Sequence, residues 1–310
     1  MPSPPPENTV GGQAVIEGVM MRAPTAWAVA VRRPDGTIEA VRHPLPRLSA
    51  RSRAARIPFI RGVMVLWESL TLGFRSLSWS AQKSQGEEEE PLTSRQLAAS
   101  MVLALVVFLA IFVLVPAAVA GAMTRGSDAI FSLVEAVLRL GLFVGYLWLL
   151  GRSGEIQRVF AYHGAEHMAI HAYEGGRDLS VESVAKFPPQ HPRCGTSFLL
   201  IVVLGSILVF SFLGRPDWPI LILSRLIGIP VIAGVAYEIL RFSGRRQSDL
   251  LGRVLAAPGL WLQRLTTRVP AEDQIEVAVT SLLSALDDEA ATEVMSRGPV
   301  PPVATAARAR

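Results

Sequence analysis

The chain has 310 residues, half of them apolar, with a formal net charge of +4 and a single cysteine. Apolar content this high, gathered in long blocks, excludes an ordinary soluble protein, and one cysteine excludes an internal disulfide framework. The basic excess is modest and lacks interleaved aromatic residues that could stack on bases. We therefore expect a membrane bilayer as the partner and no nucleic acid, while protein partners and oligomeric state stay open.

The N-terminal third is expected to hold the strands. Residues 1–8 contain four prolines and predict a disordered tail rather than a signal peptide. Residues 9–61 predict a cytoplasmic β-rich segment with a β-hairpin around the Pro-Asp-Gly turn at 34–36. Residues 62–96 then predict an interfacial amphipathic helix followed by an acidic linker.

Two pairs of apolar blocks predict transmembrane helices. Residues 97–151 hold helices at about 97–122 and 129–151, and residues 197–240 hold helices at about 197–213 and 218–240. Glu135 with Arg139, and Arg225 with Glu238, carry charge into these blocks and are expected to face the bundle interior.

Arginine and lysine are concentrated before the first block, in residues 152–196 and after the last block. The positive-inside rule then predicts a multi-pass protein of the bacterial inner membrane, with both termini and the 152–196 loop in the cytoplasm. Residues 241–295 predict cytoplasmic helices, and 296–310 a disordered tail. The expected fold is a mainly α membrane protein with about four transmembrane helices and a small cytoplasmic α+β portion.

The 152–196 loop carries the candidate chemistry, because it holds four of the five histidines and the only cysteine. Residues 155–174 lack proline and predict a helix that extends from the second span. Successive steps of four residues place His163, His167 and His171 on one helix face. His163 and His171 are about 12 Å apart along the axis, so a single ion needs an adjacent pair and a third ligand from elsewhere.

The order His163-x-x-Glu166-His167 is found in zinc hydrolases, where both histidines bind the ion and the glutamate activates water. Imidazole and thiolate ligands favour zinc, and Glu166 is the candidate catalytic base. The candidate metal ligands are His163, His167, His171, Glu174, His191 and Cys194.

Other interpretations of these residues stay open. His163-x-x-Glu166 and His171-x-x-Glu174 repeat one spacing and could serve two metals. Cys194 is a metal ligand, a nucleophile paired with a histidine, or an inert small residue. The favoured function is a zinc-dependent hydrolase acting near the inner leaflet. The alternative is a non-enzymatic membrane scaffold or regulator with a structural metal or a buried histidine network.

Several motifs together resemble the YqhQ-like family of bacterial membrane proteins, and the resemblance covers about residues 9–290. It implies a membrane architecture and a metal-dependent enzyme, in a family without a known reaction. The motifs are Gly11-Gly-Gln-Ala-Val-Ile-Glu-Gly-Val-Met-Met-Arg22, Tyr162-His-Gly-Ala-Glu-His167, His171-Ala-Tyr-Glu174, His191-Pro-Arg-Cys-Gly-Thr196 and the segments 258–263, 265–268 and 273–277.

Overall fold

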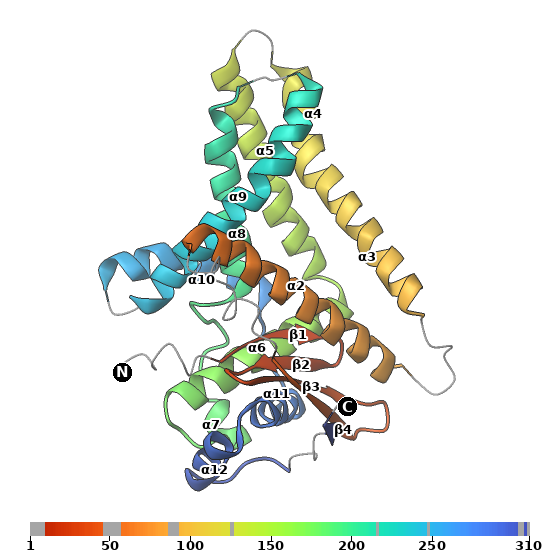
Figure 1. The fold of residues 1–310 in the computed structure, drawn as a ribbon, viewed down its shortest axis with the longest axis vertical. Coiled ribbons are helices and arrows are strands. Elements are labelled where there is room, and N and C mark those ends of the chain that lie inside the picture. Colours follow the sequence, from red (N-terminus) through yellow and green to blue (C-terminus); the bar gives the residue numbers. More distant parts are fainter. Residues whose placement is uncertain are drawn as a thin grey trace.

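A computed structural model describes residues 10–45, 57–85, 93–124, 127–214, 217–246, 249–302 and 307–308. The predicted tail at 1–8 and most of the acidic linker lie outside these ranges, as do parts of the 296–310 tail. The chain forms an α/β unit below a bundle of long helices, with helix α2 (Pro58–Lys83) between the two parts (Figure 1).

The α/β unit is built on an antiparallel sheet in which neighbouring strands follow chain order. Its predicted hairpin is confirmed as the β3–β4 pair, where Gly36 adopts the positive φ of 85° that the turn requires. A second hairpin, β1–β2, precedes it, and a two-residue strand adds in parallel to β4. The strands are β1 (Gly11–Val15), β2 (Gly18–Arg22), β3 (Ala26–Arg32), β4 (Ile38–Pro44) and β5 (Ala307–Arg308).

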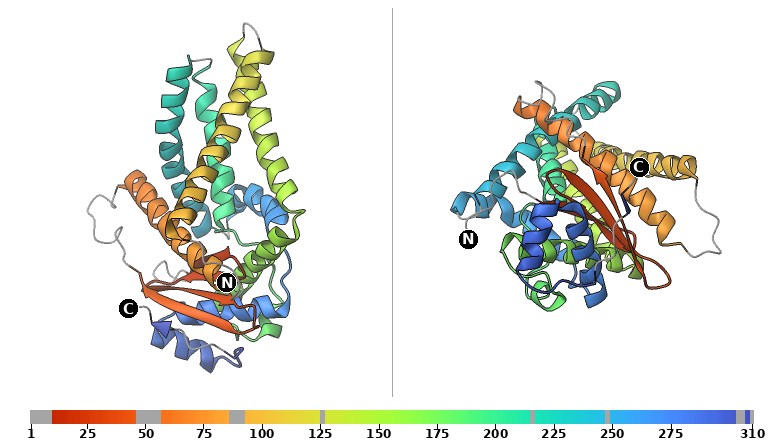
Figure 2. Two further views of the ribbon diagram at one scale, coloured as in Figure 1. Left: turned by 90° about the vertical axis from the view of Figure 1, so that its right-hand side faces the viewer. Right: turned by 60° about the horizontal axis from the view of Figure 1, so that its bottom comes forward.

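Helices cover both faces of the sheet, because the strands carry apolar side chains on both faces. On one face, Leu72 of α2 (Pro58–Lys83) packs against Val29 and other strand side chains. On the other face, α6 (Gly154–Glu174) and α11 (Glu272–Ala285) form the main core with β2 and β3. The short helices α7 (Val181–Val184) and α12 (Asp288–Ser296) pack into the same core on this face of the sheet (Figure 2).

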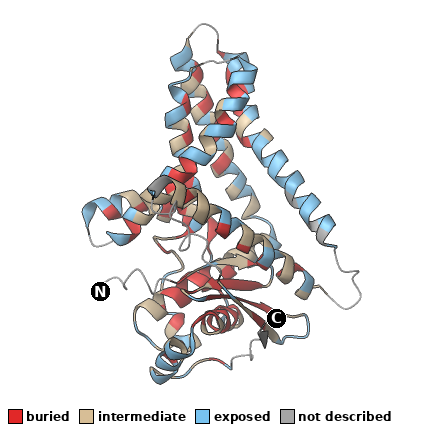
Figure 3. Cartoon of the chain, viewed as in Figure 1, coloured by how far each residue is buried: buried red, intermediate tan, exposed pale blue. Residues whose placement is uncertain are grey.

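The bundle consists of apolar helices that expose large hydrophobic side chains (Figure 3). Among the described residues, three stretches are long and apolar enough to cross a membrane, at Ala98–Met123, Asp128–Leu150 and Trp218–Arg245. The predicted third span is α8 (Gly195–Ser211), which at 17 residues falls at the short end of what a bilayer core of about 30 Å requires. The helices are α3 (Ser94–Leu109), the π-helical η3 (Ala110–Leu114), α4 (Val115–Met123), α5 (Asp128–Leu150), α8, α9 (Trp218–Arg245) and the adjoining α10 (Leu250–Thr266).

The charged residues of the bundle are paired in its interior, but with one difference from expectation. Glu135 Oε1 accepts hydrogen bonds from both Arg139 and Arg225, and all three side chains are buried. Glu238 instead pairs with Arg61 of α2. Arg225 and Glu238 therefore do not pair with each other, because Arg225 faces α5, whereas Glu238 lies where α9 meets α2.

Helix α6 is separate from α5 rather than an extension of it. The chain leaves α5 at Gly151, and Ser153 is the N-cap of α6. This break turns α6 out of the bundle and onto the sheet (Figure 1). The histidines of α6 consequently lie where the sheet, α6 and the first turn of α8 meet.

Candidate functional site

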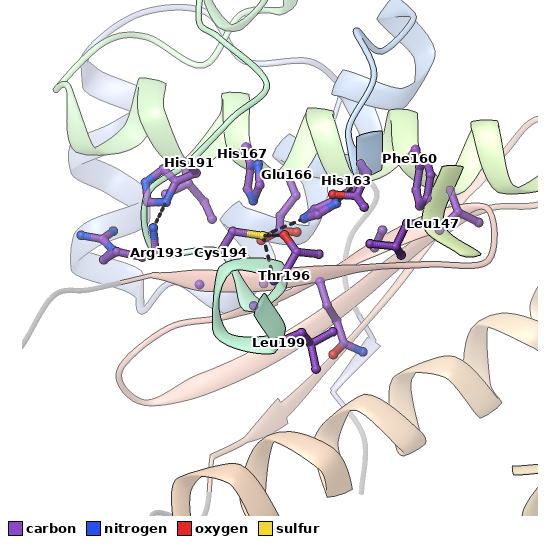
Figure 4. Close-up of a pocket in the computed structure, with 18 of the residues that line it drawn as sticks. Leu147, Phe160, His163, Glu166, His167, His191, Arg193, Cys194, Thr196 and Leu199 are labelled. Carbon is purple, nitrogen blue, oxygen red and sulfur yellow. Dashed lines mark hydrogen bonds between the residues drawn. The ribbon is translucent and has the colours of Figure 1, made fainter. Parts of the chain in front are cut away.

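The site is a cluster of three potential ligands from two helices. His163 and His167 lie one turn apart on α6, and Cys194 is the N-cap residue of α8. One atom of each residue lies within 4.8 Å of the other two, and His163 Nε2 is 3.1 Å from Cys194 Sγ. Figure 4 shows both imidazoles hanging from α6 toward the sulfur.

Backbone carbonyls orient both imidazole rings. His163 Nδ1 is 2.8 Å from the oxygen of Thr266, and His167 Nδ1 is 2.7 Å from the oxygen of Pro189. A carbonyl can only accept, so each Nδ1 carries the hydrogen and each Nε2 keeps its lone pair. This arrangement, with Nδ1 anchored and Nε2 free, is how proteins present histidine to a metal.

The loop that supplies these contacts is fixed by a buried glutamine of α10. Gln263 accepts a hydrogen bond from the His191 amide at 2.7 Å and donates to the His191 carbonyl at 2.9 Å. Its Nε2 also reaches Ser197 Oγ in the first turn of α8. One side chain therefore holds the loop before Cys194 and the start of α8 in register.

Glu166 is a buried carboxyl group beside the cluster. The backbone amide of Gly12 in β1 donates to the carboxylate, but Oε2 has no hydrogen-bond partner among the described residues. Burial raises the pKa of Glu166 to about 8, since interactions with His163 and the Gly12 amide oppose the effect only in part. Glu166 is thus a carboxyl group able to exchange a proton near neutral pH, with one oxygen uncommitted.

The sulfur of Cys194 has a polar environment although it is buried. Burial opposes ionisation, but interactions with His167 and Thr196 outweigh it and lower the pKa of the Cys194 thiol. The Thr196 amide points at Sγ at 3.4 Å, as expected for a residue at a helix N-terminus. The thiolate is the form that binds metals and acts as a nucleophile.

The structure does not bring the other three predicted ligands to this cluster. His171 Nε2 lies 2.9 Å from the Gln190 carbonyl. His191 Nδ1 accepts from the Arg193 amide, and its Nε2 is 3.7 Å from Glu174. Glu174 itself pairs with Arg193.

These three side chains form a second network, one to two turns along α6 from the cluster. Burial lowers the pKa of His191 to about 4, so its ring is neutral. Burial opposes ionisation of Glu174, but contacts with His191 and Arg193 lower its pKa. The network attaches the loop to α6, and contacts within it occupy both ring nitrogens of His191 and Nε2 of His171.

A cavity of about 410 Å³ opens on the cluster. His163, Glu166, His167 and Cys194 line one side of it, together with residues 11–14 of β1 and the preceding Val10. Its remaining wall is largely apolar and includes Leu147 and Leu150 of α5, Leu199 of α8 and Phe160 of α6. The three ligand atoms are therefore accessible from one side.

The geometry fits a zinc ion with three protein ligands. Ligand atoms around tetrahedral zinc are about 3.3–3.6 Å apart, and the three atoms of the cluster already lie within 4.8 Å of one another. Two imidazoles and one thiolate are suitable donors, and the cavity leaves a fourth position for solvent or substrate. Sequence reasoning missed the Thr266 and Pro189 carbonyls and the Gly12 amide, because backbone groups leave no signal in residue type.

The chain matches known sequences along most of its length. Residues 57–288 match the family model described as "Protein of unknown function (DUF1385)". The chain is 35% identical over 303 residues to the uncharacterized protein YqhQ of Bacillus subtilis (strain 168), covering 91% of this chain and 94% of that protein. These matches confirm the resemblance that the sequence motifs indicated. No solved structure matches the chain.

Proposed function

We propose a zinc-dependent hydrolase activity at a membrane surface for this chain, which belongs to the DUF1385 family of proteins of unknown function. The observation that carries the proposal is the cluster of His163, His167 and Cys194, with ligand atoms within 4.8 Å and one side open to a cavity. Catalytic zinc sites keep such an open position, whereas structural sites have four protein ligands.

Different residues of the site would bind the ion, transfer protons and orient the imidazole rings. His163, His167 and Cys194 would hold the ion, which when bound lowers the pKa of a coordinated water and polarises a carbonyl. Glu166 lines the same cavity and has an uncommitted oxygen, so it is placed to accept a proton from water and return it to the leaving group. Thr266 and Pro189 keep both imidazoles in the binding tautomer.

The proposed location is the cytoplasmic side of a bacterial inner membrane, with four spans and both termini inside. Three helices with the required length and composition support it, together with the arginines and lysines outside the apolar blocks. In this topology α8 is the short span, and the site lies at its N-terminal end. The cavity then opens at the level where α5 and α8 leave the bilayer.

The rival function is a scaffold or regulator in which histidines only rigidify the loop. The network of His171, His191 and Glu174 has that character, because its polar groups are directed at one another or at the backbone. His163 and His167 differ, since their Nε2 atoms converge on a sulfur beside a cavity. A wholly structural role does not explain why the buried Oε2 of Glu166 has no hydrogen-bond partner in the part of the chain that the structure describes.

Zinc content of the purified full-length chain tests the ligand assignment. We expect about one zinc per wild-type chain by elemental analysis, and little or none after single substitution of His163, His167 or Cys194 by alanine. His171→Ala is the matched control one turn further along α6, and it should retain zinc. No zinc in the wild type, or loss of zinc only with the control, would remove the proposal.

Glu166→Gln separates a hydrolase from a scaffold. This nearly isosteric variant should keep its zinc and lose hydrolysis of a pool of quenched fluorescent peptides by at least about a hundredfold, the range typical of a general base. If the zinc-loaded wild type hydrolyses none of these peptides, the scaffold is the better function. If Glu166→Gln keeps the wild-type rate, Glu166 is not the general base.

A further inference from the structure

We propose that the substrate is an extended, apolar polypeptide segment that adds as a strand to the free edge of β1, which places one of its peptide bonds at the cluster. This inference rests on the proposed hydrolase function and names its substrate class. Three observations carry it: the free edge of β1, the contact between that edge and Glu166, and the apolar wall of the cavity.

Strand β1 is the edge of the sheet on the side of the cluster. It pairs with β2, and no other described strand pairs with it. Residues 10–14 line the cavity, so this edge is open to whatever enters. An exposed strand edge presents unpaired backbone donors and acceptors, and extended peptides bind to such edges by adding a strand.

The alternation of backbone hydrogen bonds along the sheet shows which residues of β1 direct their amides and carbonyls away from β2. Ala23 donates to Ala26 and Arg32 donates to Glu17, so the odd-numbered residues of β2 bond to β3. The even-numbered residues of β2 bond to β1, and their partners are the odd-numbered residues of β1. The amides and carbonyls of Gly12 and Ala14 therefore point away from β2.

The outward edge lies directly against the catalytic carboxyl group. The Gly12 amide already donates to Glu166, which agrees with its pointing away from β2. A side chain at Gly12 would meet the Met20 carbonyl oxygen of β2 at 2.5 Å and Glu166 Cγ at 3.0 Å, so glycine leaves room here for both β2 and α6. A peptide paired with Ala14 would consequently run past Glu166 and the three ligands.

The chemistry of the cavity favours a peptide over a lipid chain. Leu147, Leu150 and Leu199 offer an apolar pocket that would accept aliphatic side chains or an acyl chain equally well. The backbone groups of Ala14 discriminate, because only a ligand with its own amides and carbonyls can satisfy them. Covering them with an acyl chain would leave buried polar groups unpaired.

Three hydroxamates test the inference, because each carries the same zinc-binding group. The probes are acetohydroxamate, the alkyl compound decanoyl hydroxamate and the peptide Leu-Leu-Leu hydroxamate. Their affinities for the zinc-loaded, full-length protein in detergent are measured by calorimetry. We expect acetohydroxamate to bind weakly, and the tripeptide to bind at least about tenfold more tightly than the alkyl compound, since it adds backbone hydrogen bonds.

N-methylation of single peptide amides gives the sharper result. Only amides that face Ala14 should matter, so alternate positions should lose about tenfold and the intervening ones should change little. In the protein, Ala14→Pro removes one outward amide without touching the β1–β2 hydrogen bonds, and it should weaken the peptide probe. Ala14→Ser is the matched control that keeps the amide.

The possible failures are distinguishable. If acetohydroxamate does not bind the zinc-loaded chain, the open metal position and the proposed function both fail. If it binds but the tripeptide is no better than the alkyl compound, or all N-methylated peptides bind alike, only the strand-addition inference is overturned. The N-methyl series uses the wild-type protein, so it decides the matter even where Ala14→Pro does not fold.

Discussion

Gly164→Ala should damage the site from a distance, because both orienting carbonyls lie beyond this glycine. A methyl group at Gly164 would overlap the Arg268 carbonyl oxygen and come within 3.2 Å of Pro189. Arg268 follows shortly after Thr266, and its backbone amide donates a hydrogen bond to the Phe160 carbonyl of α6. Relief of the overlap therefore displaces the carbonyls that hold His163 and His167.

The two energetic effects of this substitution have opposite signs. Alanine in a helix interior is favoured over glycine by about 1 kcal/mol. Overpacking against rigid backbone costs about 3 kcal/mol at the upper end of its usual range, so the net loss is about 2 kcal/mol. Loss of the hydrogen bonds from the two Nδ1 atoms to the Thr266 and Pro189 carbonyls should also lower zinc affinity by about 10–100-fold.

Thermal unfolding in detergent and zinc competition measure the two effects separately. A loss of 2 kcal/mol corresponds to a midpoint lowered by about 4–8 °C. Gly154→Ala is the matched control, since it lies on the same helix and its added methyl group meets nothing within 4 Å. Equal midpoints and equal zinc affinities for the two variants would refute the reasoning.

Two further predictions concern charged groups outside the cluster. Glu135→Gln leaves Arg139 and Arg225 buried without their shared counter-charge, so it should destabilise the bundle by about 3–5 kcal/mol, and additional Arg139→Gln should recover part of that loss in thermal unfolding. Burial, with Arg75 nearby, lowers the pKa of His43, so protonation favours the unfolded chain. Stability should therefore fall as the pH drops below about 6.5. His43→Gln should flatten that dependence between pH 5 and 8, and an unchanged slope would contradict it.

Local patterns predicted the elements well, whereas their partners required the fold. The helix at 155–174 follows from the absence of proline and is α6. The amphipathic segment at 62–80 is part of α2, but an apolar stripe does not say whether it meets lipid or a sheet. Similarly, Arg225 could be placed inside the bundle, but the choice of Glu135 depends on how α9 is rotated.

The same division applies to the site. Helical spacing alone reduced the histidines of α6 to an adjacent pair with a third ligand from elsewhere. It did not select Cys194 over His191 as the third ligand. That choice depends on which imidazole nitrogens are already hydrogen-bonded to backbone groups. The edge position of β1 was equally hidden, since strand order is a property of the whole sheet.

The cluster draws on chain segments that are far apart in order of synthesis. Gly12 comes from the first strand, His163 from a helix made before α8 and α9, and Thr266 from a residue made after both. Nascent protein lacking the last third therefore cannot hold the imidazoles in place. We expect zinc capture to be a late step of biogenesis, so that occupancy reports whether the final pair of apolar helices has been correctly inserted.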